Sequence, residues 1–158
     1  MAHFTIRLAR PDDQAATYFV CLKTGDYGRD GEPFYRDDPD ALGRIFVGPY
    51  LVYEPELSFV LEDEQGVCGY AFGSLDSHAF YDRYEREWRP RLCEQFPMPQ
   101  GDPATWTRAQ MVHSWYHQPD YFCRSMNIFV IFVFELNLLQ GLFKQRMDPN
   151  SSNFCGGK

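Results

Sequence analysis

Two short β-rich runs near the middle of the chain constrain its fold most strongly. Residues 57–61 and 67–72 are mainly apolar, and the five residues Glu-Asp-Glu-Gln-Gly at 62–66 separate them. A connection of this length that ends in glycine is typical of a β-hairpin, because glycine adopts the left-handed backbone that such turns need. The chain is therefore predicted to contain an antiparallel strand pair.

The N-terminal segment predicts a further strand followed by a helix. Residues 4–8, Phe-Thr-Ile-Arg-Leu, alternate apolar and polar side chains, which is the period of a half-buried strand. Pro11 and the two aspartates after it suit a first helical turn, since proline needs no N–H partner there and carboxylates favour the positive end of the helix dipole. Apolar residues continue at helical spacing as far as Leu22, and Gly25 is a natural stop.

The middle of the chain predicts loops and short helices. Residues 26–40 are rich in Gly, Pro and Asp and predict a loop, and residues 41–47 predict a short helix that Gly48 and Pro49 close. Residues 106–117 predict another helix. Between them, apolar residues recur at every fourth position and predict a buried helical stripe that Pro90 interrupts: Phe80, Tyr84, Trp88 and Leu92.

Composition changes after residue 122. Residues 1–122 contain 11 Lys and Arg against 20 Asp and Glu, a net charge of −9, whereas residues 123–158 have a net charge of +2. The longest apolar run of the tail, 128–134, is shorter than the roughly 20 residues of a membrane-spanning helix. We divide the chain into a front part, 1–122, and a divergent apolar tail, 123–158. Residues 127–134 are predicted to form a strand, which would complete the sheet if it docked parallel to residues 67–72.

Charge and cysteine usage limit the partners and the compartment. An acidic body argues against a nucleic-acid partner, because neutralising phosphates requires a basic face, and it fits a cationic or neutral substrate better. The five cysteines are scattered and never form Cys-x-x-Cys, which is typical of reduced thiols inside a cell. The N-terminus lacks a signal-peptide pattern. We expect a cytoplasmic or nuclear protein with no membrane segment.

Several segments resemble one group of proteins both in the order of their elements and in their sequence motifs. The resemblance rests on Phe4-Thr5-Ile6-Arg7-x-x-Arg10-Pro11-x-Asp13, Gly48-Pro49-Tyr50-Leu51, Phe59-Val60-Leu61-Glu62-Asp63 and Gly66-Val67-Cys68-Gly69-Tyr70-Ala71-x-Gly73-x-x-Asp76. On these residues the chain resembles the GNAT acetyltransferases, and among them the acetyltransferase-like domain of protein O-GlcNAcase and its stand-alone bacterial relatives. The resemblance implies an α/β fold with a mixed sheet and flanking helices, incomplete at its C-terminal end.

The resemblance implies acetyl transfer from acetyl-CoA to an amine on a small molecule, protein or peptide. In the family, a Gln/Arg-x-x-Gly-x-Gly/Ala loop holds the cofactor pyrophosphate on backbone N–H groups at a helix start. Residues 65–69 and 140–144 are the nearest matches, and neither has this spacing. A second interpretation therefore stays open, a non-catalytic pseudo-acetyltransferase that binds a protein or peptide. A third is a fragment with no function of its own.

The candidate site residues are carboxylates. Asp26 and Asp30 lie between the first two predicted helices, where GNAT proteins receive the acceptor; they suit an ammonium group, or equally a solvated loop with local caps. Asp76 closes the second hairpin strand and is either a catalytic base or the N-cap of the next helix. His113 and His117 would share one helix face, but no third ligand is fixed in the sequence, and we predict no metal site.

Overall fold

The computed structural model of the protein describes residues 3–118 and 130–133. Its four described strands form one sheet in the order β1-β2-β3-β4. The strands are β1 Thr5–Leu8, β2 Ser58–Asp63, β3 Gly66–Phe72 and β4 Val130–Val133. The α-helices are α1 Gln14–Lys23, α2 Ala41–Phe46, α3 Gly48–Tyr53, α4 Ser77–Arg83, α5 Arg89–Gln95 and α6 Arg108–Tyr116. Shorter turns are the 3-10 segments η1 Pro11–Asp13, η2 Glu32–Phe34, η3 Pro55–Leu57 and η5 Pro103–Thr105, and the π-helical segment η4 Tyr84–Trp88.

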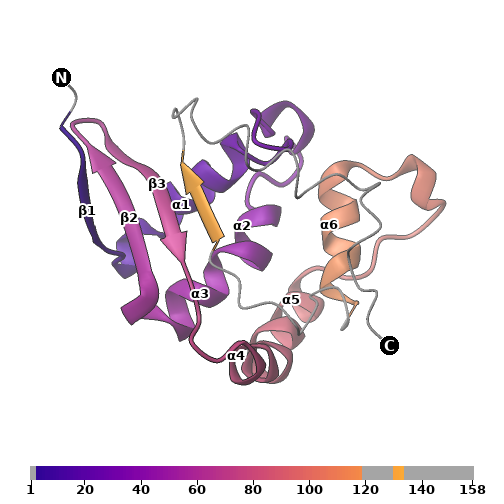
Figure 1. Cartoon of the computed structure of the whole chain (residues 1–158). Coiled ribbons are helices and arrows are strands. Elements are labelled where there is room, and N and C mark those ends of the chain that lie inside the picture. Colours follow the sequence, from indigo (N-terminus) through magenta and orange to yellow (C-terminus); the bar gives the residue numbers. More distant parts are fainter. Residues whose placement is uncertain (1–2, 119–129, 134–158) are drawn as a thin grey trace, which may run out of the picture.

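The helices are stacked in successive layers against the sheet. Helix α1 contacts β3 and β4 on one face of the sheet, α2 packs against α1, and α6 packs against α2. Figure 1 shows this order, with the sheet on one side of the molecule and α6 on the other. Amphipathic strands and helices bury their apolar sides by stacking in this way.

The predicted hairpin is confirmed. Strands β2 and β3 pair antiparallel from Ser58 opposite Phe72 to Asp63 opposite Gly66, with an irregularity between Leu61 and Glu62. Gly66 has a φ of 121°, a backbone conformation that side chains disfavour, so the glycine has the role in the turn that its position predicted.

The tail strand lies where the sequence predicted, but its direction is the opposite. Strand β4 pairs with β3, with Gly69 opposite Val133 and Phe72 opposite Val130, and the pairing is antiparallel. The predicted parallel docking is therefore wrong. All three strand pairs among the described residues are antiparallel, so the parallel component of a mixed sheet is not found among them. The predicted division at residue 122 falls outside the described residues and stays a prediction.

Aromatic side chains fill the core between the sheet and the helices. The rings of Tyr70 and Phe72 on β3 stack with centroids 4.5 Å apart, and Tyr50 of α3 stacks on Phe80 of α4 at 4.4 Å. Tyr70 and Phe72 are 2% and 0% exposed, so this stack belongs to the buried core. Offset aromatic pairs add about 0.5–1.5 kcal/mol beyond the burial of their area.

Gly48 and Pro49 follow the end of α2 and also begin a new helix, α3. They are the first two residues of α3, which follows α2 after Val47. Proline is well tolerated there because the first N–H groups of a helix have no intrahelical partner. The predicted end of the preceding helix before Gly48 is confirmed, whereas the helix that starts at Gly48 was not predicted.

The predicted aromatic stripe is confirmed as core, and its interruption by Pro90 is visible. Phe80 and Tyr84 are buried, and Trp88 packs against the same cluster. The helical run from Ser77 to Gln95 contains a π-helical turn, η4, which ends immediately before α5. Pro90 cannot donate an N–H and its ring would crowd the carbonyl of residue 86 in a regular helix, which accounts for the irregular turn there.

Candidate functional site

Asp76 lies where β3 leads into α4 and caps that helix. Its Oδ1 accepts a hydrogen bond from the backbone N–H of Ala79 at 3.0 Å, and its own backbone is extended. An aspartate in this position satisfies one of the otherwise unpaired N–H groups of the first helical turn. The structure therefore gives Asp76 the capping role, one of the two that the sequence left open.

Asp26 joins its loop to α6. The backbones of Asp26 and Arg29 bond to each other in both directions, closing a turn in which Tyr27 has a φ of 53° and Gly28 a φ of 83°. Arg108 Nη1 donates to Asp26 Oδ1 at 2.7 Å, and the same guanidinium lies 4.1 Å from the ring centroid of Phe34. The carboxylate is thus neutralised by an arginine that is distant in sequence.

Asp30 has local partners. Lys23 Nζ donates to Asp30 Oδ2 at 2.7 Å and to Glu32 Oε2 at 2.6 Å. Asp30 Oδ1 also accepts from the N–H of Glu32 at 2.9 Å. The hydrogen bond from Lys23 holds the pKa of the Asp30 carboxyl below its ordinary value. Asp30 therefore stabilises the end of α1 and its following loop.

A polar cluster that the sequence did not reveal joins α2 to α6. Asp38 Oδ2 lies 2.6 Å from Arg44 Nη1 and 2.7 Å from His113 Nε2. Burial opposes ionisation of Asp38, but the hydrogen bonds with His113 and Arg44 keep the pKa of the carboxyl below its ordinary value. Phe96 covers the guanidinium of Arg44 at 4.3 Å. No short sequence motif indicates this cluster, because its members come from separate elements.

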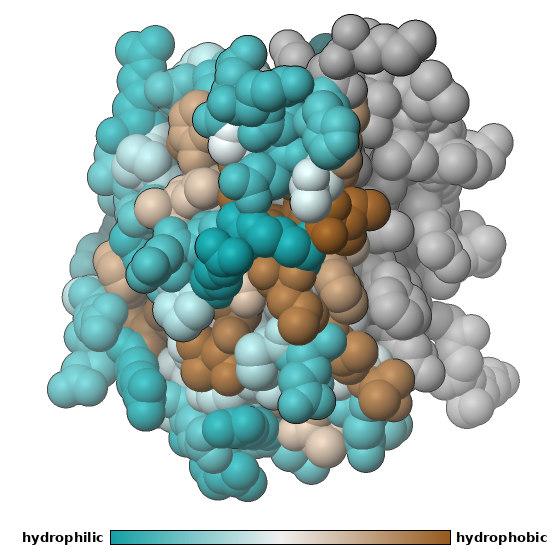
Figure 2. All heavy atoms as spheres, turned by 90° about the vertical axis from the view of Figure 1, so that its left-hand side faces the viewer, coloured by the Kyte–Doolittle hydropathy of each residue, from teal (hydrophilic) through white to brown (hydrophobic). Residues whose placement is uncertain are grey.

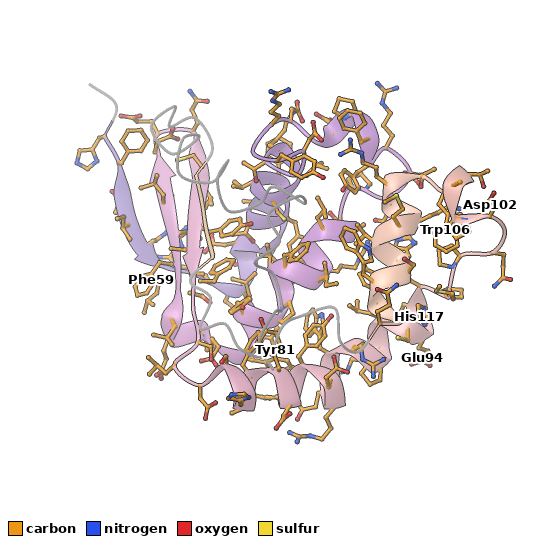
Figure 3. All side chains as sticks on the ribbon, turned by 45° about the vertical axis from the view of Figure 1, so that its right-hand side comes forward. Phe59, Tyr81, Glu94, Asp102, Trp106 and His117 are labelled. Atoms are coloured by element: carbon orange, nitrogen blue, oxygen red, sulfur yellow. The ribbon has the colours of Figure 1, made fainter. Side chains whose placement is uncertain are left out.

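His113 of α6 and His117, which follows the helix, have separate partners. His113 contacts Asp38, whereas His117 Nε2 lies 2.9 Å from the carbonyl oxygen of Phe96. Figure 3 shows His117 and Glu94 at the α5–α6 end of the molecule, far from Phe59 on the sheet. Among residues 3–118 and 130–133, no group of three or more His, Cys, Asp or Glu side chains is arranged to hold a metal ion.

A cavity of about 320 Å³ lies between η3 and Leu75. It lies between η3 and the segment that leaves β3, and Ser74 Oγ bridges the two by donating to Glu54 Oε1 at 2.8 Å. Glu54 and Glu56 take part in none of the ion pairs found among the described residues. Sequence reasoning missed this site, although the run Glu-Pro-Glu-Leu at 54–57 was a visible signal. The lining residues are Tyr53, Glu54, Pro55, Glu56, Leu57 and Leu75.

The sequence segment nearest to a pyrophosphate loop is part of the hairpin. Residues 65–69 form the end of the β2–β3 turn and the start of β3, so they do not open a helix. The other segment, 140–144, lies outside the described residues. None of the described helices is long and apolar enough to cross a membrane.

Comparison with known proteins gives matches of two kinds. No family model matches the chain. Protein O-GlcNAcase of Rattus norvegicus and that of Mus musculus are each 39% identical to it over 99 residues, or 63% of this chain. That match spans 11% of either protein, so the chain corresponds to about a tenth of their length.

A solved structure extends the similarity to nearly the whole chain. The crystal structure of SsHAT matches with a TM-score of 0.72 and 28% identity, covering 90% of this chain and 72% of that one. The similarity to SsHAT agrees with the α/β architecture, and both comparisons support a GNAT-like domain. The chain therefore contains a domain with a GNAT-like fold, and over 99 residues it is homologous to part of protein O-GlcNAcase.

Proposed function

We propose that this domain binds a basic, amine-bearing segment of a protein or peptide without transferring an acetyl group to it. The observation that most supports this proposal is that each predicted site carboxylate already has a structural partner. Asp76 caps α4, Asp26 pairs with Arg108, and Asp30 pairs with Lys23. A general base must be able to take a proton from the attacking amine, and these groups are occupied by other contacts.

Charge supports a cationic partner. The front part of the chain has a net charge of −9, and a surface of one sign attracts ligands of the opposite sign over about the Debye length. The acceptors of acetyltransferases are amines, so a domain that kept the binding surface and lost the chemistry would still favour lysine-rich segments. We place this binding in the cytoplasm or nucleus, in line with the cysteine pattern.

A second candidate function is acetyl transfer itself, with acetyl-CoA as cofactor. The observation that favours it is β4, which pairs with β3 and so extends the sheet beyond the hairpin. In the GNAT resemblance, the strand at this place supplies backbone N–H groups to the oxyanion that forms during transfer. This candidate also requires a pyrophosphate-binding segment, and the sequence of the tail lacks the expected glycine spacing.

Two titrations on the folded protein separate the candidates. Calorimetry with acetyl-CoA and fluorescence polarisation with a labelled lysine-rich peptide are run in parallel, and the peptide is then checked for acetylation by mass spectrometry. We expect saturable peptide binding, no heat with acetyl-CoA and no added mass. Acetylated peptide would establish the second candidate in place of the first, and a folded protein that binds neither ligand would exclude both.

A further inference from the structure

We propose that the cavity between η3 and Leu75 receives the side chain of a lysine or arginine from the bound segment. The inference rests on the proposed function and names the place where that function would be exercised. The cavity combines three properties that such a side chain needs: sufficient volume, an apolar wall for its methylene groups and carboxylates for its charged end.

Volume and lining suit one long side chain. The cavity measures about 320 Å³, near the lower end of the roughly 300–1,000 Å³ typical of ligand sites. Pro55, Leu57 and Leu75 supply apolar surface, and Leu75 is 82% exposed. Lysine and arginine bury their methylene stems against such surfaces while their charged ends reach polar groups.

The carboxylates of the cavity are available for a cation. Glu54 Oε1 is fixed by Ser74, which orients the group, and among the described residues no Lys or Arg pairs with Glu54 or with Glu56. This differs from the other acidic groups of interest, since Asp26, Asp30 and Asp38 all have basic partners. Hydrogen bonds from an ammonium or guanidinium to a carboxylate are about twice as strong as neutral ones.

The aromatic wall is already used by the protein itself. The guanidinium of Arg83 lies 4.2 Å from the ring centroid of Tyr53. A ligand cation would therefore be recognised mainly by Glu54 and Glu56, and less by stacking on Tyr53. This identifies the two glutamates as the residues to change.

The test uses a fluorescein-labelled twelve-residue peptide of alternating lysine and serine. Its affinity is measured by polarisation for the wild-type chain, for the double variant Glu54→Gln and Glu56→Gln, and for Glu94→Gln. Glutamine retains an oxygen that can accept from Ser74, so the fold is preserved. Glu94 is an exposed residue of α5 that does not line the cavity and takes part in no ion pair among the described residues, which makes it a control for the loss of one negative charge.

We expect the double variant to weaken binding about tenfold or more, as the loss of a charge-assisted hydrogen bond does, and Glu94→Gln to change it less than about twofold. The variant Leu75→Ser, which leaves the charge unchanged, should also weaken binding, by about threefold. A matching peptide with norleucine for lysine should not bind, and one with arginine for lysine shows which cation is preferred.

The outcomes separate the cavity from the function on which it rests. Equal, small losses in all glutamate variants would overturn the cavity assignment, while peptide binding by the wild-type chain would still support the proposed function. No binding by the wild-type chain would overturn both. Shifts of the Leu57 and Leu75 methyl resonances on adding peptide, absent in the double variant, provide a second readout of the cavity itself.

Discussion

Both faces of the sheet have apolar residues, but helices cover only one of them. On one face, Val60 is 1% exposed and lies under the helices. On the other, Ile6 is 72%, Leu8 50% and Phe59 37% exposed, and the strand register places Leu8 directly opposite Phe59. Figure 2 shows apolar residues gathered on this side of the molecule and surrounded by hydrophilic ones.

The difference shows that an apolar side chain in a strand does not by itself identify the core. Strand β2 has apolar groups on both faces, Val60 on one and Phe59 on the other, and only the packing of the helices decides which face is removed from water. Arg7 illustrates the same point for a charge. It pairs with Asp13 and Glu62, two residues that are distant from each other in sequence.

The largest expected effect comes from the covered face. Phe72→Ala removes a fully buried ring from the aromatic stack and should lower the free energy of unfolding by about 3–5 kcal/mol. Phe59→Ala on the open face is the matched control and should cost less than about 1 kcal/mol. Urea unfolding followed by fluorescence measures both, and equal losses would show that the open face is covered as well.

The next effect concerns the polar contacts beside the covered face. Asp13 accepts from Arg7 Nη1 and Nη2 at 2.7 and 2.9 Å and from the N–H of Arg10 at 2.7 Å. Asp13→Asn should therefore lower the free energy of unfolding by about 1–3 kcal/mol. The exposed neighbour Asp12, changed to Asn, should cost less than about 0.5 kcal/mol. If both substitutions have the same effect, these contacts do not stabilise the fold.

Stability should fall in acid because of the same carboxylates. Hydrogen bonds from Arg7 lower the pKa of Asp13, and those with His113 and Arg44 lower the pKa of Asp38 despite its burial. A lowered carboxyl pKa contributes stability that is present above the unfolded value of 3.8 and is lost as the pH falls below it. Urea midpoints should be nearly constant from pH 7 to about 5 and decrease below pH 4. Asp13→Asn should flatten this decrease, and an unchanged slope would contradict the assignment.

The smallest effect is expected at Asp76, which lies between β3 and α4. Asp76→Ala removes the helix cap and should cost about 1 kcal/mol, whereas Asp76→Asn, which still accepts from Ala79, should cost a few tenths. Thermal unfolding measures this pair. If the chain transfers acetyl groups and Asp76 is the base, Asp76→Asn should abolish the transfer at unchanged stability, which would separate catalysis from capping.

Local patterns predicted most of the elements. The hairpin, the first strand and the helices that begin at Gln14 and Ala41 follow from periodicity, turn residues and caps that lie within a few residues of each other. The β-branched composition of the tail strand predicted its location. Composition does not determine whether a strand runs parallel or antiparallel to its neighbour, and the antiparallel pairing with β3 depends on the path of the chain between the two strands. The helix start at Gly48 was missed because the pair Gly-Pro is used at helix starts as well as after helix ends.

The candidate site was less predictable than the fold. Asp26, Asp30 and Asp76 were chosen from their loops, yet their partners include Arg108, which is 82 residues from Asp26. The cavity beside Leu75 forms only when η3 meets the end of β3, and the cluster around Asp38 forms only when α6 meets α2. Such sites depend on contacts between distant segments, and local sequence patterns do not predict these contacts.

The sequence by itself determined most of the element types, the acidic character of residues 1–122 and the resemblance to GNAT proteins, because propensity, charge and sequence motifs are properties of neighbouring residues. Only the tertiary structure decided which carboxylates are neutralised and which face the cavity without a cation. It also decided which face of the sheet the helices cover. The physical reason is that burial and ion pairing depend on distances in space, and these are set when layers far apart in the chain pack together.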